Sequence, residues 1–169
     1  VSKTTPWNVG KQGEACLVDI SSVFKLNTGG GFKVLECHQE LKNIECGDQV
    51  LLINYGNFGA GDEPGSSHVA TVVSVKGKKF EFLESIAGMD IKSNSVDTKV
   101  MMQRVPQYKT VTFTSGGQFR GRPCNLFASD ANEAGFVLYT GVVAFVAQHV
   151  IVNTDDDDYA VSAEGIGYR

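Results

Sequence analysis

Two residues in the N-terminal half of the chain, Cys16 and His68, have the chemistry of a nucleophile and its base. A thiolate attacks carbonyl carbon, and a neighbouring imidazole can take the proton from the thiol. Such a pair also needs a third group that accepts a hydrogen bond from the imidazole and fixes its tautomer. Glu84 is the first candidate for that position and Ser85 is the alternative. These residue types predict a cysteine hydrolase.

The segment that starts at Cys16 has the spacing of one helical face, because apolar residues recur at Cys16, Leu17, Ile20, Val23 and Phe24. This spacing predicts a helix that begins near Cys16 and ends at the glycine-rich run 27–31. In the first turn of a helix, the dipole and the unpaired N–H groups favour a thiolate and could bind an oxyanion. The alternative interpretation is that Cys16 is a small buried apolar residue.

Three strands are expected downstream, at 49–55, 68–75 and 79–83, with a turn-rich loop at 56–67. The last two strands form a predicted antiparallel hairpin with His68 at its open end. A three-residue turn at 75–77 would place Glu84 opposite His68, whereas a two-residue turn at 76–77 would place Ser85 there. A single histidine is more often structural than catalytic, so the hairpin register decides this part of the hypothesis.

Short motifs in this region resemble a known pattern. Gly13-Glu14-Ala15-Cys16, then Cys46-Gly47-Asp48-Gln49-Val50, then His68-Val69-Ala70-Thr71-Val72-Val73 follow the order of the NlpC/P60 and CHAP families of papain-like cysteine peptidases and amidases. The resemblance covers about residues 10–88 and puts Glu84 at the polar position of the third strand. The chain lacks the Asp-Cys-Ser-Gly of many NlpC/P60 members. Residues 68–73 and 85–88 are also similar to type VI secretion amidase effectors.

This resemblance implies an α+β, papain-like fold in which the Cys16 helix packs on an antiparallel sheet. It implies cleavage of an amide bond in bacterial cell-wall peptide, without a cofactor, by a secreted or extracytoplasmic protein of the periplasm or cell wall. Peptidoglycan peptide is then the expected substrate, and an immunity or inhibitor protein is a further expected partner. A Cys-His acyltransferase of the same superfamily is another function that this chemistry would allow.

The length of 169 residues predicts a single domain, with a catalytic core at 1–88 and a β-rich remainder at 89–169. Within that remainder, strands are expected at 99–104, 110–114 and 136–152. The alternative to an enzyme is a non-catalytic β-rich structural or binding module of a phage or secretion system, in which Cys16 and His68 are unrelated core residues. Glycine-rich turns and a C-terminal half without motifs favour that alternative.

Composition argues against several classes of protein. A formal charge of -4, without a cluster of basic and aromatic residues, argues against nucleic-acid binding. The longest apolar stretch, 135–152, is interrupted by polar residues and is too short for a membrane span. The first residue is Val and no basic-then-apolar leader follows, which indicates a processed chain or a piece of a longer one.

The remaining cysteines, histidines and acidic residues have weaker signals. Four cysteines lack zinc-site spacing, and a Cys37–Cys46 disulfide is one interpretation of their positions. Cys124 is the rival nucleophile, because circularly permuted relatives of the papain-like fold place the histidine strand before the cysteine helix. His38 and His149 are interpreted as structural. The acidic run 155–158 lacks the pattern of a calcium loop, so no metal site is expected.

Overall fold

The computed structural model describes residues 15–29, 31–56, 65–89, 91, 98–114, 119–120, 124–125, 140–153 and 161–162. Most of the described elements are β-strands. In chain order they are β1 (Ala15–Asp19), α1 (Ile20–Leu26), β2 (Val34–Cys37), β3 (Gln49–Asn54), β4 (Ser67–Lys76), β5 (Lys79–Phe82), the short 3-10 helix η1 (Ile86–Met89), β6 (Val100–Val105), β7 (Gln107–Thr114), β8 (Phe119–Arg120), β9 (Val146–Asn153) and β10 (Val161–Ser162).

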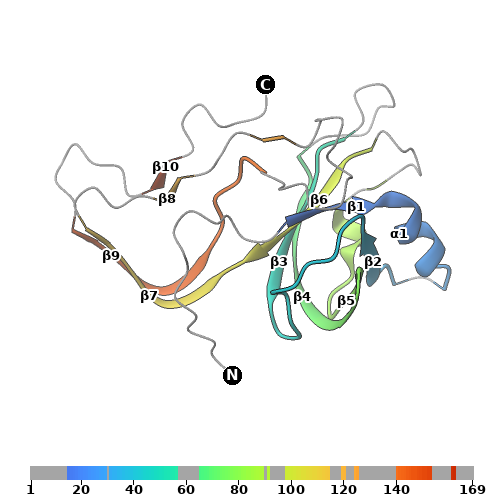
Figure 1. Cartoon of the computed structure of the whole chain (residues 1–169), viewed down its shortest axis with the longest axis horizontal. Coiled ribbons are helices and arrows are strands. Elements are labelled where there is room, and N and C mark those ends of the chain that lie inside the picture. Colours follow the sequence, from blue (N-terminus) through green and yellow to red (C-terminus); the bar gives the residue numbers. More distant parts are fainter. Residues whose placement is uncertain are drawn as a thin grey trace.

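Six of these strands close into a barrel in the order β1-β2-β5-β4-β3-β6, and every pair in it is antiparallel. Figure 1 shows the barrel beside α1. Closure depends on β6, which pairs with β3 on one side and with β1 on the other. A closed sheet has no edge strands, so the barrel satisfies the main-chain polar groups on both sides of every strand.

Apolar side chains fill the barrel, as the alternating burial along β3 shows, where Val50 and Leu52 are fully buried. Apolar residues also lie at both ends. Ile20, Val23, Ile86 and Met89, from α1 and η1, lie where β1 ends and β4 begins, and Leu41 and Ile44 lie in the connection between β2 and β3. This interior is therefore a packed core of the kind expected for a small barrel.

The expected papain-like α+β fold is wrong, and so is the helix predicted to begin near Cys16. Residues 15–18 form a strand that is buried on both faces, because Cys16 and Val18 contribute to the barrel core while Ala15 and Leu17 contribute to a second apolar cluster outside it. A continuous apolar run of this kind cannot be assigned to a helix or a strand by periodicity alone.

The helix begins instead at Ile20, where Asp19 caps it. The Asp19 carboxylate accepts hydrogen bonds from the Ser21 backbone N–H at 3.0 Å and from the Ser21 hydroxyl at 2.7 Å. Such a cap satisfies one of the backbone donors that are unpaired in the first turn of a helix. The helix is only seven residues long and ends at Leu26, before the glycine-rich run that was predicted to end it.

The predicted hairpin of β4 and β5 is confirmed, but neither predicted register is correct. Lys76 pairs with Lys79, so the turn consists of Gly77 and Lys78. Gly77 has φ of 60°, the conformation that a type II′ turn requires at its first central position. An irregularity between Val72 and Ser74 shifts the pairing further. As a result, neither Glu84 nor Ser85 is paired with His68.

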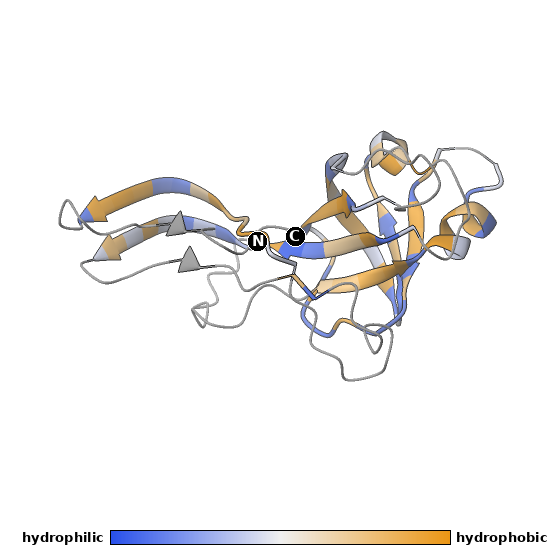
Figure 2. Cartoon of the chain, turned by 90° about the horizontal axis from the view of Figure 1, so that it is seen from above, coloured by the Kyte–Doolittle hydropathy of each residue, from blue (hydrophilic) through white to orange (hydrophobic). Residues whose placement is uncertain are grey.

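Beyond the barrel, β6 continues through Pro106 into β7, which pairs with β9 in a two-stranded parallel ribbon. Figure 2 shows this ribbon projecting away from the barrel. A further parallel pair joins β8 and β10. The expected strands at 99–104 and 110–114 are confirmed as β6 and β7. Of the strand expected at 136–152, residues 146–152 lie in β9, residues 140–145 are not in a strand, and residues 136–139 lie outside the described part of the chain.

Candidate functional site

Cys16, the predicted nucleophile, lies inside the barrel and is bonded to Cys37. The disulfide links β1 to β2, where Cys37 pairs with Val18, the residue two positions after Cys16. Cys16 is 0% exposed and Cys37 is 2% exposed. The proposed Cys37–Cys46 disulfide is therefore wrong, and Cys46 is a free, exposed cysteine. In this arrangement Cys16 has neither a thiol nor access to a substrate.

His68, the predicted base, lies near the start of β4 and is partly buried. It is on the same face of the strand as Ala70 and Val72, which point into the barrel core. Its Nδ1 lies 3.5 Å from the position that a Cβ would have at Gly88, so the ring packs against η1. Its Nε2 is buried and makes no hydrogen bond within the described part of the chain.

The pairing of residues between neighbouring barrel strands shows where Cys16 lies relative to His68. Cys16 pairs with Met102 on β6, Met102 pairs with Leu52 on β3, and Leu52 pairs with His68 on β4. Both side chains thus face the interior, but β1 and β4 are on opposite sides of the six-stranded ring. The buried side chains of Met102 and Leu52 occupy the two intervening positions of this row. The two predicted partners are not neighbours on the barrel wall.

Glu84 accepts its hydrogen bonds from a threonine of β4 rather than from His68. One carboxylate oxygen accepts the Thr71 backbone N–H at 2.7 Å and the other accepts the Thr71 hydroxyl at 2.9 Å. These hydrogen bonds, the backbone one first, hold the pKa of Glu84 below its usual value, and proximity to His68 adds a small effect in the same direction. Ser85 is exposed, and its hydroxyl accepts the Ala87 backbone N–H at 3.3 Å.

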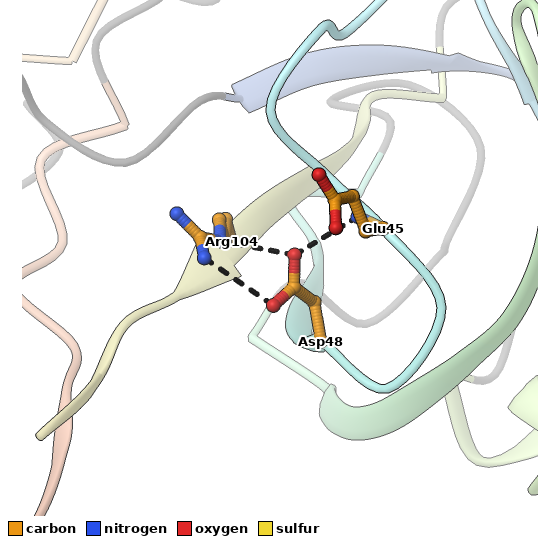
Figure 3. Close-up of polar contacts among 3 residues, drawn as sticks. All are labelled: Glu45, Asp48 and Arg104. Carbon is orange, nitrogen blue, oxygen red and sulfur yellow. Dashed lines mark hydrogen bonds and ion pairs between the residues drawn. The ribbon is translucent and has the colours of Figure 1, made fainter. Parts of the chain in front are cut away.

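The Gly-Asp turn of the predicted motif has a structural role at the end of the barrel opposite to His68 (Figure 3). Asp48 accepts the Glu45 backbone N–H at 2.9 Å and a hydrogen bond from Arg104 Nη2 at 3.3 Å. Arg104 Nε lies 3.2 Å from the second Asp48 oxygen as an ion pair without hydrogen-bond geometry. Gly47 has φ of 92°, which lets the chain turn into β3. The contact between Asp48 and Arg104 therefore joins β6 to the start of β3.

Cys124, the rival nucleophile, packs on the outside of the barrel. It contacts a cluster formed by Ala15, Leu17 and Met101, together with Ile53 and Tyr55. The Tyr55 hydroxyl donates to the Thr140 carbonyl at 2.8 Å. Burial, with a smaller contribution from Cys124, raises the pKa of Tyr55. The surroundings of Cys124 given by this cluster are thus mainly apolar.

The remaining histidines lie in two different settings. His38 follows β2, its backbone N–H donates to the Leu17 carbonyl, and burial lowers the pKa of its imidazole. His149 lies on β9 and is exposed. Among the residues that the structure describes, no three histidine, cysteine or acidic side chains lie together as metal ligands. The acidic run 155–158 lies outside the described residues, as do Gly13 and Glu14 of the first motif.

Sequence reasoning missed the structural importance of two polar residues. Asn27 is buried at the C-terminus of α1, where its amide donates to the carbonyls of Val23 and Val34 at 2.6 and 2.7 Å. Its carbonyl accepts the backbone N–H groups of Lys33 and Val34. An asparagine before a glycine run is a recognisable cap signal, but its bond to β2 is visible only in the fold. Arg104 has no sequence signal of its own.

Comparison with known proteins gives no family for this chain. No family model, no curated protein and no solved structure matches it. In the described residues, no helix has the length and apolar character needed to cross a bilayer. The Cys16–Cys37 disulfide is consistent with an oxidising, extracytoplasmic location, where such bonds form and persist.

Proposed function

We propose that this chain is a non-catalytic, disulfide-stabilised β-barrel module of an extracytoplasmic assembly, such as a phage or secretion system. The observation that carries the proposal is the state of Cys16, which is fully buried and bonded to Cys37 in the barrel core. A cysteine nucleophile has to be a thiolate and has to reach its substrate. Cys16 meets neither condition in this fold, and its burial is the ordinary setting of a structural disulfide.

The positions of His68 and Glu84 support the same interpretation. His68 packs against η1 inside one end of the barrel, and Glu84 is engaged by both donors of Thr71. A base and its orienting group act as a set only when each is hydrogen-bonded to the next. Here the two residues have separate structural roles, one in the core and one in joining the end of β5 to β4.

The cysteine-hydrolase hypothesis makes the opposite prediction and stays a prediction. For Cys16 to act, the disulfide would have to be reduced and the barrel would have to open beside β1, which is paired on both sides. The two hypotheses therefore differ most clearly in a reducing buffer, where a latent cysteine enzyme would gain activity and a structural barrel would lose stability.

The test is hydrolysis of purified peptidoglycan fragments by the full chain, with and without a thiol reductant, followed by chromatography of the products. We expect no released peptide in either buffer. Thiol titration of the denatured, unreduced protein should find the two free cysteines, Cys46 and Cys124. Peptide release that disappears in a Cys16→Ala variant would overturn the proposal, and release that disappears only in Cys124→Ala would do so in favour of the rival nucleophile.

A further inference from the structure

The strand β9 has the composition of an interface strand. Its eight residues, VAQHVIVN, include no Asp, Glu, Lys or Arg, and no proline or glycine. Four aliphatic side chains on it are half exposed: Val146 at 48%, Val150 at 52%, Ile151 at 44% and Val152 at 55%. Natural edge strands usually carry charges, prolines or bulges that prevent a further strand from pairing. β9 has none of these protective features.

The ribbon has two described strands, and β9 is the less covered of them. Among the described strands, only β7 pairs with β9. Two-stranded sheets are marginal in water, and three or more strands are needed for independent stability. Parallel pairs are slightly weaker still and are normally covered on both faces. One face of this ribbon is apolar, since Val111 pairs with Val150 and Phe113 pairs with Val152. On that face the β7 side chains are buried, whereas Val150 and Val152 of β9 stay more than half exposed.

We propose that β9 is the self-association site of this protein, where a second copy adds its own β9 in antiparallel pairing. The two ribbons would then form one four-stranded sheet in the order β7-β9-β9-β7. The strand that best complements β9 is another uncharged strand rich in β-branched residues, and a second copy supplies one. Copies of a chain with a net charge of -4 repel one another, and β9 offers a contact without charged side chains.

The register of such a pair follows from the faces of the strand. Centred on Val150, it places Val150 against Val150 and Gln148 against Val152 in both directions. Directly opposed residues share a face, so the apolar face formed by Val111, Phe113, Val150 and Val152 would continue from one copy into the other. The contact is isologous, which limits the assembly to two copies.

The direction of the ribbon favours antiparallel over parallel addition. The Val146 backbone N–H bonds to the carbonyl of Pro106, directly after the last barrel strand, so β9 begins beside the barrel and runs away from it. Figure 2 shows the ribbon extending away from the barrel. Eight residues of strand span roughly 26 Å at about 3.3 Å each. Antiparallel addition places the second barrel at the far end, whereas parallel addition would bring two barrels side by side.

The test is the mass of the oxidised full chain by sedimentation equilibrium over a range of protein concentrations. We expect a concentration-dependent rise toward twice 18.2 kDa. Val150→Lys should give the mass of one chain, because it opposes two ammonium groups at the centre of the pair. The matched control is Val69→Lys, at a valine of β4 that is 48% exposed on the barrel, and it should leave the mass of the pair unchanged.

A second variant keeps the result decisive if Val150→Lys does not fold. With Cys46 and Cys124 changed to serine, Val150→Cys should form a disulfide between copies on mild oxidation, and Val69→Cys should not. A wild-type chain that stays at the mass of one copy, or a pair that survives Val150→Lys, overturns the proposal. Self-association does not depend on hydrolysis, so either proposal can fail without the other.

Discussion

The barrel and the ribbon of β7 and β9 are built from similar β-branched and aromatic residues, yet they bury them very differently. Each of the six barrel strands pairs with two neighbours, and Val50, Leu52 and Phe80 are 0% exposed. Each ribbon strand pairs with one described neighbour, and Val150 and Val152 are more than half exposed. On the ribbon, Val111 and Phe113 of β7 are buried at 8% and 5% exposure, so the uncovered aliphatic side chains belong to β9, which has no second neighbour among the described strands.

The barrel is also cross-linked in ways that extend beyond its hydrogen-bond ladders. The Cys16–Cys37 disulfide connects β1 and β2, Asp48 and Arg104 connect β3 and β6, and Asn27 connects α1 to β2. These contacts join elements that closure already brings together. The comparison therefore predicts that changes in the barrel affect folding of the chain, whereas changes on the ribbon affect association.

The largest expected effect is from truncation of a core aromatic. Phe80→Ala should lower the free energy of unfolding by about 3 to 5 kcal/mol, since Phe80 is fully buried and its loss leaves a cavity. Ile151→Ala on the ribbon should change it by less than about 0.5 kcal/mol. Urea unfolding at low protein concentration measures both values. Similar losses at the two positions would contradict the difference drawn between the regions.

Removal of the disulfide should have the next largest effect. Its cysteines are 21 residues apart, and a loop of that length stabilises a fold by about 3 kcal/mol through the entropy of the unfolded chain. The double variant Cys16→Ala, Cys37→Ala should therefore unfold at a lower urea concentration, and wild type in reductant should behave similarly. Cys46→Ser is the control at an exposed, unbonded cysteine. A midpoint that reductant does not move would argue against this disulfide.

The smallest expected effect concerns the pH dependence of Glu84. Hydrogen bonds from Thr71 lower the pKa of this carboxyl in the folded state. A lowered pKa adds stability that is present above the unfolded pKa and is lost as the pH falls through the folded pKa. The melting temperature of wild type should therefore exceed that of Glu84→Gln at neutral pH, and the gap should close under acid conditions. A difference in melting temperature that stays constant with pH would refute the role of the charge. Thr71→Val removes the hydroxyl donor to Glu84, so it should reproduce part of the difference seen at neutral pH.

Local pattern was sufficient for the barrel strands that alternate in burial. Residues 49–55 and 68–75 have β-branched or aliphatic positions between turn residues, and the observed strands Gln49–Asn54 and Ser67–Lys76 match them within one residue. The β4–β5 hairpin was predictable for the same reason, since a glycine-containing turn separates two such runs. The register of this hairpin was not predictable, because one residue more or fewer in the turn changes the pairing, and so does the irregularity in β4 beyond the turn.

The candidate site failed to assemble because it rested on contacts that are distant in the sequence. Cys16 was assigned to a helix on the spacing of apolar residues, but pairing with Met102, far along the chain, makes this segment a strand. A disulfide between Cys37 and Cys46, the nearest cysteine in sequence, was one interpretation of the spacing, whereas the β1–β2 ladder brings Cys37 to Cys16. Short motifs identified real turns and strands without specifying which strands become neighbours.

The sequence by itself determined the β-rich character of the chain and the positions of several core strands, because these depend on local alternation and on turn residues. The tertiary structure alone decided that the sheet closes through β6, that Cys16 is a buried half-cystine and that β9 is half exposed. The physical reason is that strand pairing joins residues far apart in the chain, and a local pattern contains no information about which partner a strand meets.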